Sequence, residues 1–294
     1  MCPLCGLSST TGCYLPDTIF NHKRFTYKKC KVCCTIFVFP PPSPEDLCKM
    51  YDYESYHSIF YKNTEESQGS FNKSLALLKG YLPQGKLLDV GCGVGSFMTE
   101  AARAGFTVWG TELNNDLISV LTSKGLATLS SEDLKDVHYH HFFDVIHMGD
   151  VLEHSPSPGI FLHNLLSLLK PNGYFLIEGP LENNNTISLF MLKLYKYIQK
   201  NIKKNIVCQH VPYHITMMTY QGFTNFLNKS SLKITKSVIF EHDWPLKIDF
   251  SKKQFMSIIK NIVSFISVKV GNSFLGKKMK WGNRILVISK KGGY

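Results

Sequence analysis

The chain has 294 residues, of which 44% are hydrophobic, 19% charged and 13% aromatic. This composition excludes a disordered or collagen-like chain, and the length predicts one large domain with an appendage, or two domains. The net charge is +11, but residues 190–294 alone carry nineteen lysine and arginine residues against three acidic ones. Such a basic excess indicates a phosphate-bearing substrate, an anionic membrane surface or nucleic acid, with a solvated lysine-rich face as the alternative.

Residues 1–39 are rich in cysteine and contain short β-like runs. Two Cys-x-x-Cys pairs in this segment supply Cys2, Cys5, Cys30 and Cys33. Their spacing is that of a tetrahedral zinc site built from thiolates. So short a segment cannot bury enough apolar surface to fold alone, and we therefore expect a structural zinc ion. Reduced cysteines without metal are the alternative, and Cys13 or Cys34 could replace one of the ligands.

A proline-rich linker separates this segment from the rest of the chain. We assign residues 40–69 to the linker and to a lid segment, in which Tyr53 and Tyr56 are the candidate lid residues. The start of the chain has no basic region followed by an apolar signal core, and no stretch reaches the length of a membrane span. We therefore expect a cytoplasmic protein with reduced thiols.

From residue 70 onward, apolar runs of strand length alternate with helical periodicity. The strands are expected over 86–90, 106–111, 126–130, 143–148, 173–178, 232–240 and 284–289. The helices are expected over 70–82, 95–104, 114–123, 158–169, 186–203, 219–228 and 251–268. This alternation is typical of βαβ units and predicts an α/β domain over residues 70–294, built on a mostly parallel sheet.

The sharpest motif is a glycine-rich turn at the end of the first strand of this domain. It reads Asp89-Val90-Gly91-Cys92-Gly93-Val94-Gly95, and the next strand ends in Glu112. Glycines allow the backbone to approach a ligand at a helix N-terminus, and the acid stands where a ribose diol can be held. A nicotinamide-binding turn would need its third glycine at Ser96. The observed form resembles that of the class I S-adenosylmethionine-dependent methyltransferases instead.

Two later segments strengthen this resemblance. Residues 143–154 and 168–177 look like the fourth strand, the Leu-Glu-His segment and the Leu-Lys-Pro-Gly-Gly turn of the branch that includes ubiquinone-biosynthesis and sugar methyltransferases. The resemblance implies a doubly wound, Rossmann-like sheet of seven strands, with an antiparallel final strand at 285–288. The cysteine pairs and the linker resemble the N-terminal zinc ribbon of bacterial methyltransferases that act on sugars and surface polysaccharides.

The resemblance also implies a set of residues that bind S-adenosylmethionine. These residues are Asp89, Gly91, Gly93, Gly95, Glu112, Leu113, Asp133 and Leu134. The glycines would surround the methionine part, Asp89 would support the turn, Glu112 would hold the ribose hydroxyls, and Leu113 would lie beside the adenine. Asp133 would reach the exocyclic amine of the adenine, although a Ser-x-Asp helix cap explains that residue equally well.

Three histidines are candidates for a general base, which methyl transfer needs only where the acceptor must lose a proton. His154 follows the fourth strand, and His210 and His214 precede the helix expected at 219–228. Histidine titrates near neutrality and can accept a hydroxyl proton. A hydrogen bond that organises the loop is the alternative role for His154, and substrate contact without proton transfer is the alternative for the other two.

The two basic helices expected over 186–203 and 251–268 each carry their apolar residues on one face. We expect these faces to pack on the sheet, while contact with an anionic membrane is the alternative.

The resulting hypothesis is a methyltransferase that acts on oxygen or carbon of a small molecule, sugar or glycan, as in polysaccharide biosynthesis. The basic excess of the last third favours an acceptor that carries phosphate. RNA methylation, or non-catalytic binding of nucleic acid on a methyltransferase scaffold, is the alternative. Nucleic acid is the less favoured partner, because the sequence lacks the Asn/Asp-Pro-Pro-Tyr tetrapeptide of base amino-methylation and a clear stacking platform.

Overall fold

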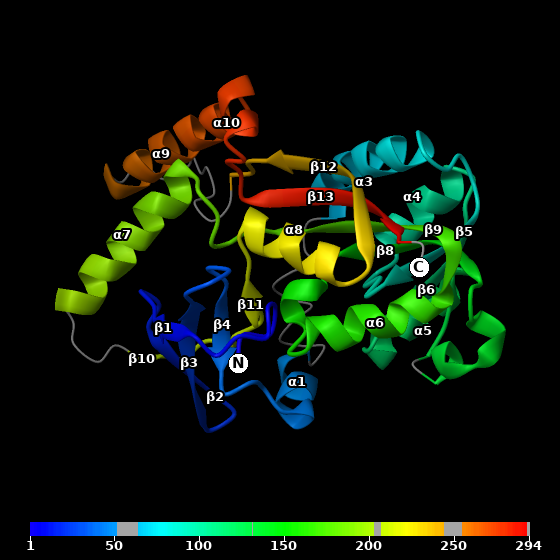
Figure 1. The fold of residues 1–294 in the computed structure, drawn as a ribbon, viewed down its shortest axis with the longest axis horizontal. Helices are drawn as coiled ribbons and strands as arrows, with labels where there is room; N and C mark the ends of the chain where they lie inside the picture. Colours follow the sequence, from blue (N-terminus) through cyan, green and yellow to red (C-terminus); the bar gives the residue numbers. More distant parts are fainter. Residues whose placement is uncertain (52–63, 131, 203–206, 244–254, 293–294) are drawn as a thin grey trace.

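The computed structural model describes residues 1–51, 64–130, 132–202, 207–243 and 255–292 (Figure 1). Within these residues, seven strands form one large sheet in the order β12-β13-β9-β8-β5-β6-β7. The strands are β5 (Lys86–Val90), β6 (Thr107–Thr111), β7 (Ala127–Thr128), β8 (Phe143–Gly149), β9 (Leu169–Pro180), β12 (Leu232–Phe240) and β13 (Arg284–Lys291). The strands from β9 to β7 pair in parallel, whereas β13 is antiparallel to both β9 and β12. The predicted seven-stranded sheet with an antiparallel final strand is confirmed.

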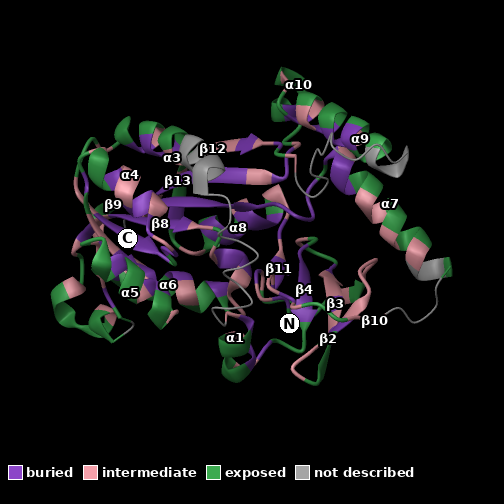
Figure 2. Ribbon diagram, turned by 180° about the vertical axis from the view of Figure 1, so that it is seen from behind, coloured by how far each residue is buried: buried purple, intermediate pink, exposed green. Residues whose placement is uncertain are grey.

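Helices cover both faces of this sheet. They are α3 (Thr64–Lys79), α4 (Ser96–Arg103), α5 (Asn115–Ser123), α6 (Pro158–Leu168) and α8 (Tyr220–Lys229). Because side chains alternate along a strand, Leu87 packs with residues of α3 and α4, whereas Leu88 belongs to the core formed with α6 and α8. Figure 2 shows the buried strands between these helices. The doubly wound α/β architecture predicted from the sequence is therefore confirmed.

The segment around Pro171 departs from the prediction of a turn between helix and strand. Helix α6 ends at Leu168 and β9 begins at the next residue. Pairing with β8 jumps from Leu169 to Tyr174, so the four residues between them bulge out of the strand. The proline and glycine interrupt the ladder here without ending the strand.

A second, smaller sheet contains the cysteine-rich segment. Its strands are β1 (Thr10–Gly12), β2 (Asp17–Phe20), β3 (Lys23–Cys30), β4 (Ile36–Phe39), β10 (Val207–Cys208) and β11 (Thr216–Met217). The sequence did not indicate β10 or β11, which come from the segment after β9 and pair with β2 and β4. These pairings bring residues 207–217 against the N-terminal segment, although almost 200 positions separate them in the chain.

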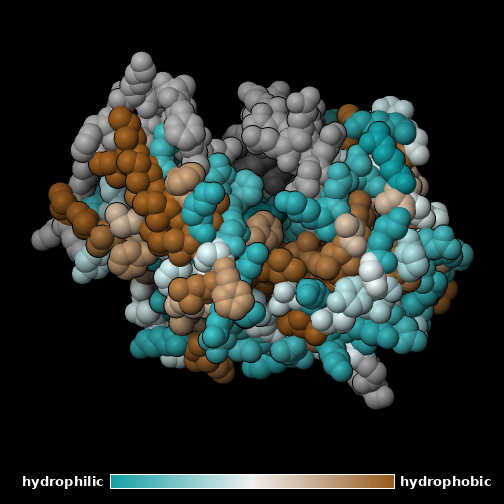
Figure 3. Space-filling model, turned by 90° about the horizontal axis from the view of Figure 1, so that it is seen from above, coloured by the Kyte–Doolittle hydropathy of each residue, from teal (hydrophilic) through white to brown (hydrophobic). Residues whose placement is uncertain are grey.

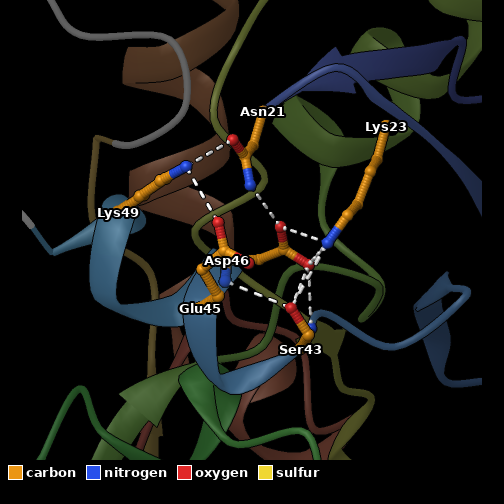
Figure 4. Close-up of polar contacts among 6 residues, drawn as sticks. All are labelled: Asn21, Lys23, Ser43, Glu45, Asp46 and Lys49. Carbon is orange, nitrogen blue, oxygen red and sulfur yellow. Dashed lines mark hydrogen bonds and ion pairs between the residues drawn. The ribbon is translucent and has the colours of Figure 1, made fainter.

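Helix α1 (Pro44–Met50) lies inside the segment assigned to the linker and begins at its last proline. Ser43 and Asp46 form a reciprocal capping box, a signal that the proline-rich reading overlooked. The Asp46 carboxylate is buried, and it accepts hydrogen bonds from Asn21 and Lys23 of the N-terminal sheet region (Figure 4). Burial opposes ionisation of Asp46, but these hydrogen bonds hold its pKa below the usual range. The network anchors α1 and places Tyr51 directly after its last turn.

The predicted lid residues Tyr53 and Tyr56 lie outside the described residues. The remaining helices are α7 (Ile187–Ile202), α9 (Phe255–Gly271) and α10 (Phe274–Lys278), which extend away from the large sheet (Figure 1). Among the described helices, none combines the length and apolar character needed to cross a membrane.

Candidate functional site

The glycine-rich turn joins β5 to α4 at the carboxyl end of the parallel strands. Gly91, Gly93 and Gly95 have φ angles of 68°, 55° and 77°, a region that favours glycine. A Cβ atom added to Gly95 would lie 2.5 Å from a methyl carbon of Leu121, and one on Gly91 would lie 3.0 Å from Val151. The turn therefore needs glycine both for its backbone conformation and for its close packing.

Glu112 connects this turn to the start of α5. One carboxylate oxygen accepts a hydrogen bond from the Gly93 amide at 3.0 Å. The other oxygen accepts from the amides of Leu113 and Asn114, at 2.7 and 3.0 Å. The oxygen bonded to Gly93 keeps the capacity to accept a ribose hydroxyl, since a carboxylate oxygen has two acceptor sites. Leu113 is 84% exposed beside it, which leaves its side chain available to an adenine ring.

Asp133 takes the capping role that the sequence had left open. Its carboxylate accepts from the Ser130 amide at 2.7 Å, and its own amide donates to the Ser130 hydroxyl at 3.1 Å. These hydrogen bonds lower the pKa of Asp133. Leu134 is partly buried against the main core. Asp133 and Leu134 therefore shape the loop after β7.

Asp89 lies buried beneath the turn and pairs with His147, a residue of β8 that sequence reasoning missed. The Asp89 carboxylate lies 2.7 Å from Nδ1 of His147, and Glu178 of β9 lies 3.6 Å from Nε2. Burial alone would lower the pKa of His147, but the negative charge of Asp89 raises it to about 9. Phe97 of α4 stacks on the imidazole at 3.6 Å between ring centroids. Asp89, His147 and Glu178 thus connect the three neighbouring strands β5, β8 and β9 under the glycine-rich turn. The available signal in the sequence was a histidine flanked by apolar residues within a strand.

A second cluster forms where β8 ends. His154 belongs to the short 3-10 helix η3 (Leu152–His154), and its ring lies 4.9 Å from that of His214, measured between centroids. The ring of Tyr51 packs edge-on against His154 at 5.8 Å. The Tyr51 carbonyl also accepts from the Asn114 side chain at 3.4 Å, which connects the cluster to the Glu112 strand end. The structure thus brings two of the three candidate histidines together, linked through Tyr51 to Asn114 after the end of β6.

The two clustered histidines have opposite charge states. Nδ1 of His154 donates to the Tyr213 carbonyl at 2.8 Å, while burial and the nearby charge of His214 lower the pKa of His154 to about 4. Burial would also lower the pKa of His214, but Glu182, at 2.8 Å from its Nδ1, raises it to about 9. At neutral pH, His154 is therefore a neutral base with an available Nε2, and His214 is a cation.

Glu153 adds a neutral acid to this cluster. Burial and the charge of Asp150 raise its pKa to about 8. Ligand atoms of Glu153, His154 and His214 lie within 4.8 Å of one another, a set that could also hold a divalent cation. Sequence reasoning missed Glu153 and Glu182, which follow the ends of the buried strands β8 and β9 by four and two residues.

The structure separates His210 from this cluster. Its Nδ1 lies 3.3 Å from the Thr18 hydroxyl, and its Nε2 lies 3.3 Å from the Tyr27 hydroxyl, both in the N-terminal sheet. The strand pairing of β10 with β2 carries His210 there. Of the two histidines that precede α8, only His214 therefore lies in the cluster with His154.

The four predicted zinc ligands converge in the N-terminal segment. Sγ of Cys2 lies 3.6 Å from that of Cys33, and Sγ of Cys5 lies 3.6 Å from that of Cys30. All four sulfur atoms lie within 4.8 Å of one another. Zinc–sulfur bonds of about 2.3 Å in a tetrahedron place sulfur atoms about 3.8 Å apart, so the cluster fits a zinc ion. Cys13 instead packs in the small-sheet core, and Cys34 is exposed with a φ of 59°.

Comparison with known proteins agrees with the fold and the turn. Both features define a class I S-adenosylmethionine-dependent methyltransferase. Residues 67–236, more than half of the chain, match the family model described as a methyltransferase domain, and the chain belongs to that family.

The relatives in curated sequences are similar over part of their length. A ubiquinone biosynthesis O-methyltransferase of Actinobacillus pleuropneumoniae is 30% identical over 132 residues, which cover 40% of this chain and 55% of that protein. The enzyme of the same name from Hydrogenovibrio crunogenus is 31% identical over 96 residues, covering 30% and 39%. The chain thus spans about half the length of the curated relatives it matches.

Solved structures show the same fold at low identity. A SAM-dependent methyltransferase from Archaeoglobus fulgidus has a TM-score of 0.52 and 22% identity, with 81% of this chain and 99% of that chain covered. The 1,6-didemethyltoxoflavin-N1-methyltransferase of Burkholderia thailandensis has a TM-score of 0.54 and 11% identity, with 95% and 100% covered.

Proposed function

We propose that the protein transfers a methyl group from S-adenosylmethionine to a hydroxyl oxygen of a small-molecule acceptor, with His154 as the general base. The observation that carries this proposal is the hydrogen bond that fixes the His154 imidazole. Its Nδ1–H is committed to the Tyr213 carbonyl, which leaves the Nε2 lone pair to accept a proton. Relatives named as O-methyltransferases support oxygen as the acceptor atom.

The residues of the glycine turn fit the cofactor. Glycines at 91, 93 and 95 would hold the methionine part, Glu112 the ribose, and the exposed Leu113 the adenine. S-adenosylmethionine, when bound, supplies a methyl group on a sulfonium that an oxygen nucleophile can displace in line. The chain's own contribution is to hold the acceptor at attack distance and to take its proton.

His214 has a complementary role in this proposal. Because Glu182 keeps it protonated, His214 can donate through Nε2 to an acceptor oxygen that gains negative charge as His154 removes the proton. Two histidines 4.9 Å apart with pKa values pushed in opposite directions form an acid and base pair.

A cavity supports an acceptor that carries phosphate. It has a volume of about 590 Å³ and is lined by Asn183 and Asn184, which follow Glu182, and by Cys5 and Cys33 of the cysteine cluster. Of the lining residues that the structure describes, none belongs to the glycine turn or to the His154 and His214 cluster. Four lysines line it, and no carboxylate is among its described lining residues; the lysines are Lys29, Lys193, Lys229 and Lys280. We therefore extend the proposal to phosphate-bearing acceptors such as phosphorylated sugars.

Calorimetric titration with S-adenosylmethionine tests the cofactor site first. Glu112→Ala should weaken binding, whereas Glu45→Ala, which removes an exposed glutamate of α1, should not. No binding by the folded protein would refute the proposed function.

Turnover with labelled S-adenosylmethionine and a panel of hydroxylated acceptors, phosphorylated and dephosphorylated, tests the chemistry. His154→Gln should lower kcat by about 10²–10⁴-fold while leaving cofactor affinity unchanged, and His210→Gln should retain activity. Equal activity in His154→Gln and the wild type would refute the assignment of the base.

A further inference from the structure

Helices α7, α9 and α10 carry apolar side chains on their solvent side. More than half of the exposed large apolar side chains in the described residues belong to these three helices. We call the exposed apolar side chains of these three helices the α7–α9 face. They include Phe190 at 64%, Tyr197 at 60%, Phe265 at 53% and Phe274 at 85% exposure. Figure 3 shows hydrophobic surface gathered at the end of the molecule where Figure 1 places α7 and α9. The expected packing of these apolar faces on the sheet is therefore wrong.

The side of this helix pair that is turned inward is polar instead. Ser267 of α9 and Ser188 of α7 both donate to one carboxylate oxygen of the buried Glu241, at 2.7 and 2.8 Å. The Ser188 amide donates in turn to the Ser267 hydroxyl at 2.9 Å. Asn261 and Ser264 of α9 are buried on the same side. This network holds both helices with their apolar residues facing outward. In a helix that packs on the core of its own protein, the apolar residues face inward instead.

The charge of the three helices helps to distinguish between two candidate partners for this face, a second copy of the chain and an anionic surface. Lys193 is turned inward and donates to the carbonyls of Asn183 and Asn184. The other lysines, from Lys196 on α7 to Lys278 on α10, remain, and the three helices contain no aspartate or glutamate. A second copy docking through the same face would bring lysines against lysines, which disfavours a symmetric dimer. An anionic surface with an apolar interior complements both properties at once.

We propose that the α7–α9 face binds the surface of an anionic lipid bilayer. The aromatic and aliphatic side chains enter the boundary between headgroups and acyl chains, and the lysines lie at the level of the lipid phosphates. The carboxyl ends of β5 and β8 belong to the large sheet, so they do not form part of the surface that attaches to the bilayer. The inference is independent of the proposed methyl transfer, because it rests on a surface formed by other elements.

Sedimentation of the full chain with lipid vesicles tests this inference. The protein should sediment with vesicles of phosphatidylcholine and 30% phosphatidylglycerol, and at least tenfold less with phosphatidylcholine alone. The double variant Phe190→Ser/Phe265→Ser should weaken binding to the anionic vesicles at least tenfold. Ile160→Ser, which removes a side chain that is 66% exposed on α6, is the matched control and should bind like the wild type.

Two additional measurements keep the outcomes distinct. Circular dichroism and titration with S-adenosylmethionine check that each variant is folded, so a failure of the methyltransferase proposal is seen separately. Failure of the folded wild type to bind anionic vesicles would overturn the inference, as would equal weakening by Ile160→Ser. A dimer in analytical ultracentrifugation that Phe190→Ser/Phe265→Ser dissociates would also overturn it, because a second copy would then cover the face.

Discussion

Gly95 is the N-cap residue of helix α4, and its replacement by alanine should be destabilising for two separable reasons. Its φ of 77° is unfavourable for a residue with a side chain, by about 1–2 kcal/mol. The added Cβ would also lie 2.5 Å from Leu121 and 2.6 Å from Leu126. Leu121 is fully buried, so it cannot move aside without disturbing the core, and such overpacking costs about 1–3 kcal/mol. We therefore expect Gly95→Ala to lower the free energy of unfolding by about 2–5 kcal/mol.

Gly125 provides a control in which only the backbone cost is present. Its φ is 70°, and no heavy atom of the described residues lies within 4 Å of an added Cβ. Gly125→Ala should thus cost about 1–2 kcal/mol. The effect of alanine on the unfolded chain is common to both variants and cancels in their difference. Urea unfolding followed by circular dichroism measures both values, and an equal loss in the two variants would refute the packing argument.

Three other predictions concern metal, pH and the buried ion pair. Elemental analysis of the purified protein should find one zinc ion per chain. Cys30→Ser should lose this zinc, whereas Cys13→Ser should keep it, and zinc retained by Cys30→Ser would contradict the proposed site. Turnover should be highest between about pH 5 and 8, since it falls as His154 is protonated near pH 4 and as His214 loses its proton near pH 9. A midpoint near pH 6.5 on the acid side would contradict this assignment. The pKa of His147 is raised to about 9, so its ionic interaction stabilises the folded protein fully below about pH 6.5 and is lost as pH rises through 9. In urea unfolding, the difference in free energy of unfolding between wild type and His147→Gln should therefore shrink by about 3 kcal/mol over that interval.

The most accurate predictions concerned features that a local sequence pattern determines. The strand-turn-helix unit around Gly91 was predicted within a residue, because an apolar run, three glycines and an amphipathic helix follow one another without interruption. The four zinc-site cysteines were predicted from spacing alone, and the structure brings them together. The strands β10 and β11 escaped prediction because each has two residues, too few for any periodicity, and both are stabilised by pairing with a distant segment.

The helices α7 and α9 show a different limit. Periodicity correctly placed residues such as Phe190 and Ile198 on one face, but it does not tell which face is turned to the protein. That orientation depends on Glu241, which directly follows β12. Its carboxylate accepts hydrogen bonds from Ser188 of α7 and Ser267 of α9 and so holds the polar side of both helices inward. A buried carboxylate that lies outside both helices thus accounts for the orientation that the pattern left open.

The support of His154 and His214 depends on the N-terminal segment, whereas the glycine-rich turn depends mainly on the large sheet. The Ile215 amide donates to the Glu153 carbonyl at 2.8 Å, in the stretch that also pairs β11 with β4. The Thr219 hydroxyl donates to the carbonyl of Cys33, one of the zinc-site cysteines, at 3.2 Å. Glu112 and the glycine turn, in contrast, are held by the large sheet and its helices. Loss of zinc should therefore impair acceptor turnover before it weakens S-adenosylmethionine binding, because it loosens the support of His154 and His214 and leaves the cofactor turn intact.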